Sequence, residues 1–179
     1  MLKKILIALA VLVVGFLIVV ALQPSDYRVE RSARIAASPA VVFGQINDLH
    51  RYELWNPWAK FDPAAKYTHS GAPVGVGASL AWAGNSQVGE GRMTIRESRP
   101  NDEVRMTLEF IKPFASVATT DFSIKEDGGQ SIVTWSMYGR KNFMSKAMCL
   151  FMSMDKMIGG QFEEGLATLK AMSEEAEKK

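Results

Sequence analysis

The sequence predicts an α+β domain in which a curved antiparallel sheet carries a long C-terminal helix, preceded by one transmembrane helix. Three observations support this. Residues 5–22 contain no charged or hydrogen-bonding side chain, residues 66–138 consist mainly of alternating apolar segments joined by short turns, and residues 143–177 repeat apolar side chains at helical spacing. Short connections between successive strands imply antiparallel pairing, and the helix covers one face of the sheet.

The N-terminal apolar run is long enough to cross a bilayer. Eighteen residues at ~1.5 Å each span ~27 Å, close to the hydrocarbon thickness of a membrane. A cleaved signal peptide has a shorter apolar core of roughly 7–15 residues and a small-residue cleavage site, for which Val19-Val20-Ala21 is a poor match. A buried soluble helix would need a polar face, and the run has none. We therefore expect residues 1–23 to be an uncleaved signal anchor and residues 24–179 to form the domain.

The leader lysines predict the orientation of this anchor. Lys3 and Lys4 favour a cytoplasmic N-terminus, which places residue 24 onward outside. Arg28, Arg31 and Arg34 follow the run, but they belong to a folded domain rather than to a short loop. We expect a single-pass protein of the inner (cytoplasmic) membrane whose C-terminal domain faces the periplasm or the cell exterior.

Composition argues against several classes of site. The chain has 21 basic residues, of which Lys3 and Lys4 lie in the leader, and 19 acidic residues, so the domain is nearly neutral and carries no nucleic-acid footprint. A single cysteine excludes an intramolecular disulfide and a cysteine-based metal site. His50 and His69 are nineteen positions apart without zinc-like spacing. We expect no metal and no cofactor.

The strands are predicted by alternation. The pattern is clearest at Val104, Met106, Leu108 and Phe110, where every second residue is apolar. Ser38-Pro39 marks a helix start, with Ser as the N-cap and Pro at the first helical position. The other expected strands contain residues 27–36, 80–82, 92–98, 117–125 and 131–138.

The closing segment, residues 143–177, is predicted to be one long helix. Phe162, Leu166 and Leu169 lie on one face. The pair Gly159-Gly160 interrupts the segment, and each glycine costs about 1 kcal/mol relative to alanine in a helix interior. We expect a kink or short break there.

The first half of this segment has a second apolar face. Met144, Met148 and Met152 project away from the sheet-facing side, and Lys146 and Lys156 lie beyond them. Such a stripe flanked by lysines suits contact with lipid headgroups. One hypothesis is that this face is a gate that rests on the membrane and swings at the two glycines. The alternative is that a loop or a neighbouring subunit covers the methionines.

Several short motifs carry a family resemblance. They are Arg31-Ser32, Ser38-Pro39 with Val42-Phe43, Trp55-Asn56-Pro57-Trp58, and residues 154–160 followed by Phe162 and Gly165-Leu166. Together they resemble the START-like superfamily, specifically the bacterial polyketide cyclase/dehydrase and lipid-transport type (SRPBCC), over roughly residues 27–175. The resemblance implies a helix-grip fold, a seven-stranded sheet wrapped round the C-terminal helix with a deep apolar cavity between them. It identifies the function poorly, because one fold hosts many functions, and a membrane anchor is not part of the family pattern.

In-phase side chains on consecutive strands, with three from the helix, are the predicted cavity lining. The alternative is that all of them are ordinary core. The predicted lining residues are Leu80, Trp82, Met93, Ile95, Met106, Leu108, Phe110, Phe122, Trp135, Met154, Ile158 and Phe162.

No catalytic residues are predicted. Acid–base chemistry needs a carboxylate or histidine inside the cavity, whereas Glu109 and Asp121 are out of phase with the apolar faces and should point to solvent. No pair of candidate acids stands out. The favoured function is a membrane-tethered module that binds a lipid or another hydrophobic small molecule. The alternatives are an envelope interaction protein with a closed cavity and a cyclase/dehydratase-like enzyme.

Overall fold

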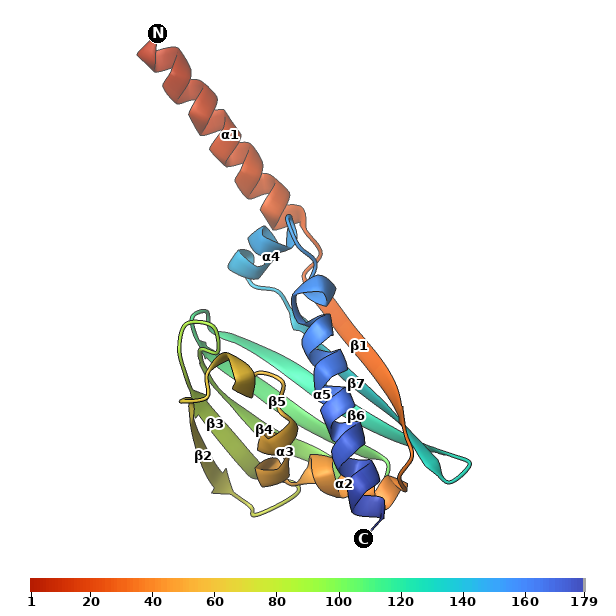
Figure 1. The fold of residues 1–179 in the computed structure, drawn as a ribbon. Helices are drawn as coiled ribbons and strands as arrows, with labels where there is room; N and C mark the ends of the chain where they lie inside the picture. Colours follow the sequence, from red (N-terminus) through yellow and green to blue (C-terminus); the bar gives the residue numbers. More distant parts are fainter. Residues whose placement is uncertain (179) are drawn as a thin grey trace.

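A seven-stranded antiparallel sheet in the order β1-β7-β6-β5-β4-β3-β2 forms the body of the protein. The computed structural model describes residues 1–178. The long helix α5 lies along the sheet, and α2 and α3 lie at the end of the sheet away from α1 (Figure 1). The strands are β1 (Asp26–Ile35), β2 (Lys66–Gly71), β3 (Ala78–Ala83), β4 (Glu90–Arg99), β5 (Glu103–Lys112), β6 (Ser116–Asp127) and β7 (Gln130–Arg140).

The helices agree with the predicted α+β helix-grip fold, which is confirmed. An apolar helix precedes β1 and projects away from the sheet (Figure 1). The helix has 21 residues, and its most apolar 18-residue stretch has a mean hydropathy of 3.4 and is almost entirely exposed. By length and composition this helix could cross a membrane. The helical elements are α1 (Leu2–Leu22), α2 (Pro39–Asn47), α3 (Leu49–Trp55), the 3-10 turn η1 (Ala59–Phe61), α4 (Phe143–Cys149) and α5 (Met154–Glu177).

Alternation along the strands produces the core. In β5, Val104 and Met106 are fully buried, and they pair with Phe122 and Thr120 of β6. From α5, Phe162, Leu166 and Leu169 are buried against the sheet, as their spacing predicts. Because the side-chain period of a strand is two, the same face of each strand meets the helix.

The predicted break in the closing segment is in the wrong place. The segment is two helices separated at residues 150–153, and α5 runs without interruption through Gly159 and Gly160. Each helix begins at its own N-cap, and that of α5 lies at the break. The Asn142 side chain at the start of α4 accepts a hydrogen bond from the Ser145 amide at 2.8 Å, and the Ser153 hydroxyl at the start of α5 accepts one from the Lys156 amide at 3.3 Å. N-capping by Ser153 therefore marks the break, and the low helix propensity of the glycines does not.

Gly159 leaves room for a neighbouring charged side chain. A Cβ at Gly159 would clash with the guanidinium of Arg31, lying 2.9 Å from its Cζ, whereas a Cβ at Gly160 would meet nothing. Arg31 reaches from β1 to α5, where Nη1 lies 2.7 Å from Asp155 Oδ1 and Nε lies 2.7 Å from Glu163 Oε1. The Arg31 hydrogen bond lowers the pKa of Asp155. These contacts hold α5 against the edge strand.

The two glycines provide a matched test of this contact. Gly159→Ala should lower the free energy of unfolding by up to about 1 kcal/mol, because the added methyl displaces the guanidinium of Arg31 from its exposed ion pairs. Gly160→Ala should raise it by up to about 1 kcal/mol, because only the helix propensity changes. Denaturant unfolding of both variants measures the difference. Equal effects of the two substitutions would contradict the assignment.

Candidate functional site: an apolar cavity at one end of the sheet

A cavity of about 260 Å³ lies between β2–β5, α3 and α5. Its volume is just below the ~300–1,000 Å³ typical of ligand pockets. Most of its wall is apolar, with several polar groups at one side. The lining residues are Tyr52, Asn56, Trp58, Tyr67, Leu80, Trp82, Gln87, Val88, Met93, Leu108, Phe110, Lys112, Pro113, Met137 and Ile158.

Half of the predicted lining residues border this cavity and half do not. The first group is Leu80, Trp82, Met93, Leu108, Phe110 and Ile158. In the second group, Met154 is partly buried and packs against the core. The other five members of that group are at most 2% exposed and form the core itself: Ile95, Met106, Phe122, Trp135 and Phe162.

An aromatic cluster centred on Trp135 accounts for this division. Its ring is stacked on Phe162 with centroids 4.1 Å apart and on Phe122 at 4.9 Å. Trp55 and Trp58 meet it edge-on at 5.7 and 6.0 Å. The rings fill the middle of the space between sheet and helix. What space remains lies on the side of Ile158.

The indole nitrogen of Trp135 is satisfied within the core. It donates to Thr120 Oγ1 at 2.8 Å, and that hydroxyl donates to the Ser136 carbonyl at 3.1 Å. Gly165 of α5 lies over the same ring, since a Cβ there would be 2.7 Å from Trp135 Cζ3. The helix can approach this closely because the residue has no side chain. The cluster is therefore a fixed part of the core beside the cavity, and among its rings Trp58 borders the cavity.

Sequence phase missed nine lining residues, for three reasons. Met137 shares the phase of Trp135 in β7 and could have been found by alternation. Lys112 ends β5 in phase with Phe110, but a charged residue is not selected by an apolar pattern. The others come from a helix, turns and loops, or from β2, whose pattern is mostly polar, so that strand periodicity gives no signal. These are Tyr52, Asn56, Trp58, Tyr67, Gln87, Val88 and Pro113.

The polar groups that line the cavity are neutral, apart from Lys112. Asn56 Nδ2 donates to the Tyr67 hydroxyl at 3.4 Å. Burial raises the pKa of Tyr52 and of Tyr67, so both phenols stay neutral at physiological pH. None of the fifteen lining residues, all within residues 1–178, is a carboxylate or a histidine. The cavity therefore offers neutral hydrogen-bonding groups and packing surface.

The mouth of the cavity lies at the end of the domain from which α1 projects. Lys112 and Pro113 line the cavity, and two residues later the Ala115 carbonyl accepts a hydrogen bond from Asn142 Nδ2 at 3.3 Å. Asn142 caps α4, and α4 is in contact with α1. Figure 1 shows the same arrangement, with α4 between the foot of α1 and the loops at that end of the sheet.

A pair of acids that the sequence pattern did not reveal lies on the outer face of the sheet. Glu103 is 4% exposed and pairs with Arg99 and Arg105. Asp121 lies beside it, with Oδ1 3.7 Å from Arg105 Nε. The expectation that Asp121 points to solvent is wrong in one respect, because its side chain is only 17% exposed. The cluster is on the opposite face from the cavity, which is consistent with a structural role.

The two histidines, far apart in sequence, are stacked in space. The rings of His50 and His69 have centroids 3.7 Å apart, Glu53 contacts His69, and Asp48 contacts His50. Within residues 1–178, no three His, Cys, Asp or Glu side chains converge as metal ligands would. The stack joins α3 to β2 beside the cavity wall.

Comparison with known proteins agrees with the fold. Residues 26–174 match the family described as polyketide cyclase / dehydrase and lipid transport. The chain belongs to this family. Among proteins of curated function, none matches the sequence.

Solved structures of this family's fold resemble the chain at low sequence identity. Protein CV1439 from Chromobacterium violaceum is 15% identical, with 84% of this chain and 99% of that one covered and a TM-score of 0.56. The protein jhp0584 from Helicobacter pylori is 11% identical, with coverage of 83% and 89% and a TM-score of 0.61. The di-domain aromatase/cyclase StfQ of steffimycin biosynthesis is 11% identical, with coverage of 85% and 52% and a TM-score of 0.61. At these identities the likeness establishes the fold alone.

The outer acid pair gives a pH-dependent prediction. Burial, followed by the neighbouring Glu103, raises the pKa of Asp121 from 3.8 to about 6. A carboxyl whose folded pKa exceeds its unfolded value stabilises the protein at low pH, and this contribution is lost as pH rises from about 4 to about 6. Asp121→Asn should therefore raise the free energy of unfolding at neutral pH, by at most about 3 kcal/mol, and flatten its pH dependence.

Denaturant unfolding between about pH 4 and pH 7 measures this effect. Asp102→Asn is the control, because that carboxylate is 61% exposed. A loss of stability at neutral pH in Asp121→Asn would show that the Arg105 pairing outweighs the burial of Asp121.

Proposed function

We propose that this protein is a membrane-tethered binding module that holds a lipid or another hydrophobic small molecule in the cavity. The observation that carries the proposal is the position of an apolar cavity with neutral polar groups at the end of the domain next to α1. Its family, described by cyclase, dehydrase and lipid-transport activities, fits the same ligand class.

The cavity is suited to a short or partly inserted apolar group. Its volume of about 260 Å³ is small for a complete phospholipid, so one acyl chain or a compact ring system is the expected occupant. Each buried methylene contributes ~0.8 kcal/mol, which allows tight binding without a charged contact. Tyr67 and Asn56 would hydrogen-bond a carbonyl or hydroxyl of the ligand.

The tether consists of residues 1–23, followed by the domain of residues 24–179. In this proposal α1 crosses the inner membrane, Lys3 and Lys4 hold the N-terminus in the cytoplasm, and the domain faces the periplasm or the cell exterior. The domain then stays beside the bilayer that supplies the ligand. Only the short link Gln23-Pro24-Ser25 separates α1 from β1.

Binding is preferred to catalysis because the cavity lining holds no carboxylate or histidine, and its only charged side chain lies at the mouth. The nearest charged lining residue, Lys112, is exposed at the mouth and pairs with Glu90 at 2.7 Å. General acid–base catalysis needs such a group within reach of the substrate. A cyclase-like reaction in this cavity would have to rely on positioning and neutral hydrogen bonds alone.

Filling the cavity should abolish ligand binding. Leu108→Trp adds a large ring to the lining, whereas Leu54→Trp makes the same change at a side chain that is 69% exposed. Native mass spectrometry of each full-length variant, extracted mildly from its host membrane, should find a bound lipid in the parent and in Leu54→Trp but not in Leu108→Trp. Identical ligand content in both variants would place the ligand outside the cavity. An empty parent with a stoichiometric protein partner would favour the envelope interaction function.

The tether should remain on the mature protein. The intact mass of the membrane-extracted chain should include residues 1–23, and a C-terminal alkaline phosphatase fusion should be active because that enzyme matures outside the cytoplasm. A shortened chain recovered in the soluble fraction would indicate a cleaved signal peptide. An inactive fusion on an intact chain would show that the C-terminal domain faces the cytoplasm, opposite to the predicted orientation.

A further inference from the structure

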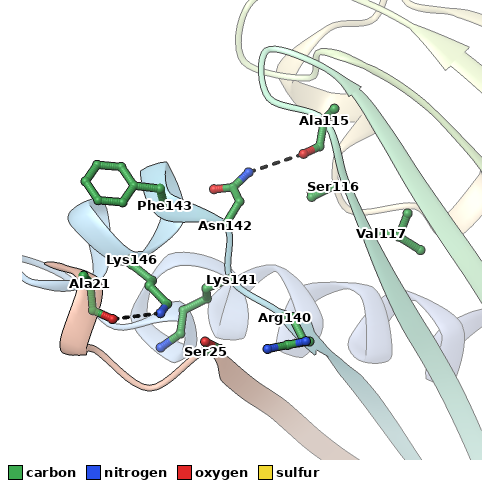
Figure 2. Close-up of a pocket in the computed structure, with 10 residues that line it drawn as sticks. All are labelled: Ala21, Ser25, Ala115, Ser116, Val117, Arg140, Lys141, Asn142, Phe143 and Lys146. Atoms are coloured by element: carbon green, nitrogen blue, oxygen red, sulfur yellow. Dashed lines mark hydrogen bonds between the residues drawn. The ribbon is translucent and has the colours of Figure 1, made fainter.

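An open depression of about 590 Å³ lies where α1 meets the domain. It is bordered by the end of α1, the β5–β6 connection, the end of β7 and the first turn of α4 (Figure 2). Three cationic side chains line it, Arg140, Lys141 and Lys146. Figure 2 shows Lys141 and Lys146 extending towards Ala21 and Ser25 at the foot of α1.

These cations have little compensating negative charge. Lys146 Nζ donates to the Ala21 carbonyl at 3.3 Å. Arg140 Nε is 3.9 Å from Asp26 Oδ1, and both of those side chains are more than 80% exposed. Within residues 1–178, no carboxylate lies at ion-pair distance from Lys141 or Lys146. The depression is therefore positively charged and open to an anion.

The position of α1 fixes the level of the depression relative to the bilayer. A helix of 21 residues is ~32 Å long at 1.5 Å per residue, about the thickness of the hydrocarbon core. With α1 across a bilayer, Ala21 lies at the boundary between hydrocarbon and headgroups. Lys146, which donates a hydrogen bond to the Ala21 carbonyl, is then at the level of the lipid phosphates.

The helix beside the depression exposes a continuous apolar surface. In and just after α4, the exposed fractions are 50% for Phe143, 44% for Met144 and Met148, 84% for Phe151 and 51% for Met152. Because α4 contacts α1, this surface lies at the membrane boundary. A short segment with large apolar side chains beside cations is typical of an element that lies in the interfacial plane.

We propose that the depression binds the phosphate group of an anionic phospholipid, while the exposed face of α4 dips into the same leaflet. This inference rests on the tethering of the proposed function. Phosphate oxygens meet Arg140, Lys141 and Lys146, and the acyl chains lie against Met144 and Met148. The contact orients the domain so that the Lys112-Pro113 mouth of the cavity faces the bilayer.

The test uses the full chain in lipid nanodiscs. Cys149 is replaced by Ser, and Met148→Cys carries a fluorophore that is quenched by spin-labelled lipid. The same spin-labelled acyl chain is supplied on phosphatidylglycerol or on phosphatidylcholine at equal mole fraction. Phosphatidylglycerol should quench more strongly, and neutralising each cation should lower this preference by up to about fivefold.

Two triple variants separate a specific site from general charge. In Arg140→Gln/Lys141→Gln/Lys146→Gln, the two spin-labelled lipids should quench the fluorophore equally. The control Arg96→Gln/Lys125→Gln/Lys178→Gln removes the same charge from positions outside the depression and should keep the parent's preference. Inorganic phosphate should compete no better than chloride of equal ionic strength, since the ligand is a lipid headgroup.

Three results would overturn the inference. Equal quenching of the parent's fluorophore by the two lipids would show that the depression does not select an anionic headgroup. Strong competition by inorganic phosphate would show that it binds free phosphate instead. Absence of quenching by either lipid shows that protein or a second copy covers α4. The ligand content of Leu108→Trp is measured separately, so an empty cavity with intact quenching refutes cavity binding alone. Release of the chain from the nanodisc refutes the tether.

Discussion

The stacking of Trp135 on Phe162 is the contact on which the arrangement of sheet and helix depends. It joins the middle of β7 to the middle of α5 with ring planes only 5° apart, and Gly165 allows the helix to approach the indole. Phe122 and Trp55 complete the cluster. An aromatic group of this size buries a large apolar area, so α5 is fixed at its centre.

The position of the cavity is a consequence of that cluster. The rings fill the centre of the space between the sheet and α5. The unfilled volume therefore lies on one side, between Trp82, Leu108 and Ile158. The edge strand is held independently by Arg31, whose ion pairs to α5 need the space that Gly159 leaves. The packed centre and the clamped edge are thus built by two different interactions, and the open end is the volume that the aromatic cluster leaves unfilled.

The division of the closing segment separates two tasks. From residue 154 onward, α5 is part of the core, with Phe162 and Leu169 completely buried. Before residue 150, α4 is exposed and touches α1. The capped break between them lets one segment serve the core while the other faces the foot of α1. Exposed methionines on α4 are consistent with an adaptable apolar contact surface.

The sequence by itself determined the fold class, the strands, the buried stripe of α5 and the apolar N-terminal helix. All of these follow from the local periodicity of apolar residues and the length of each segment. It also selected in-phase residues such as Leu80 and Phe110 that border the cavity. Phase alone could not separate them from Met106 or Phe122, since core and cavity residues occupy the same face of a strand. Only the tertiary structure decided which side the Trp135 cluster fills, brought Tyr52 and Tyr67 to the cavity wall, and assigned Gly159 to Arg31 rather than to a hinge. The physical reason is that cavities and close approaches depend on contacts between elements distant in the chain, whereas helices and strands are largely specified by neighbours.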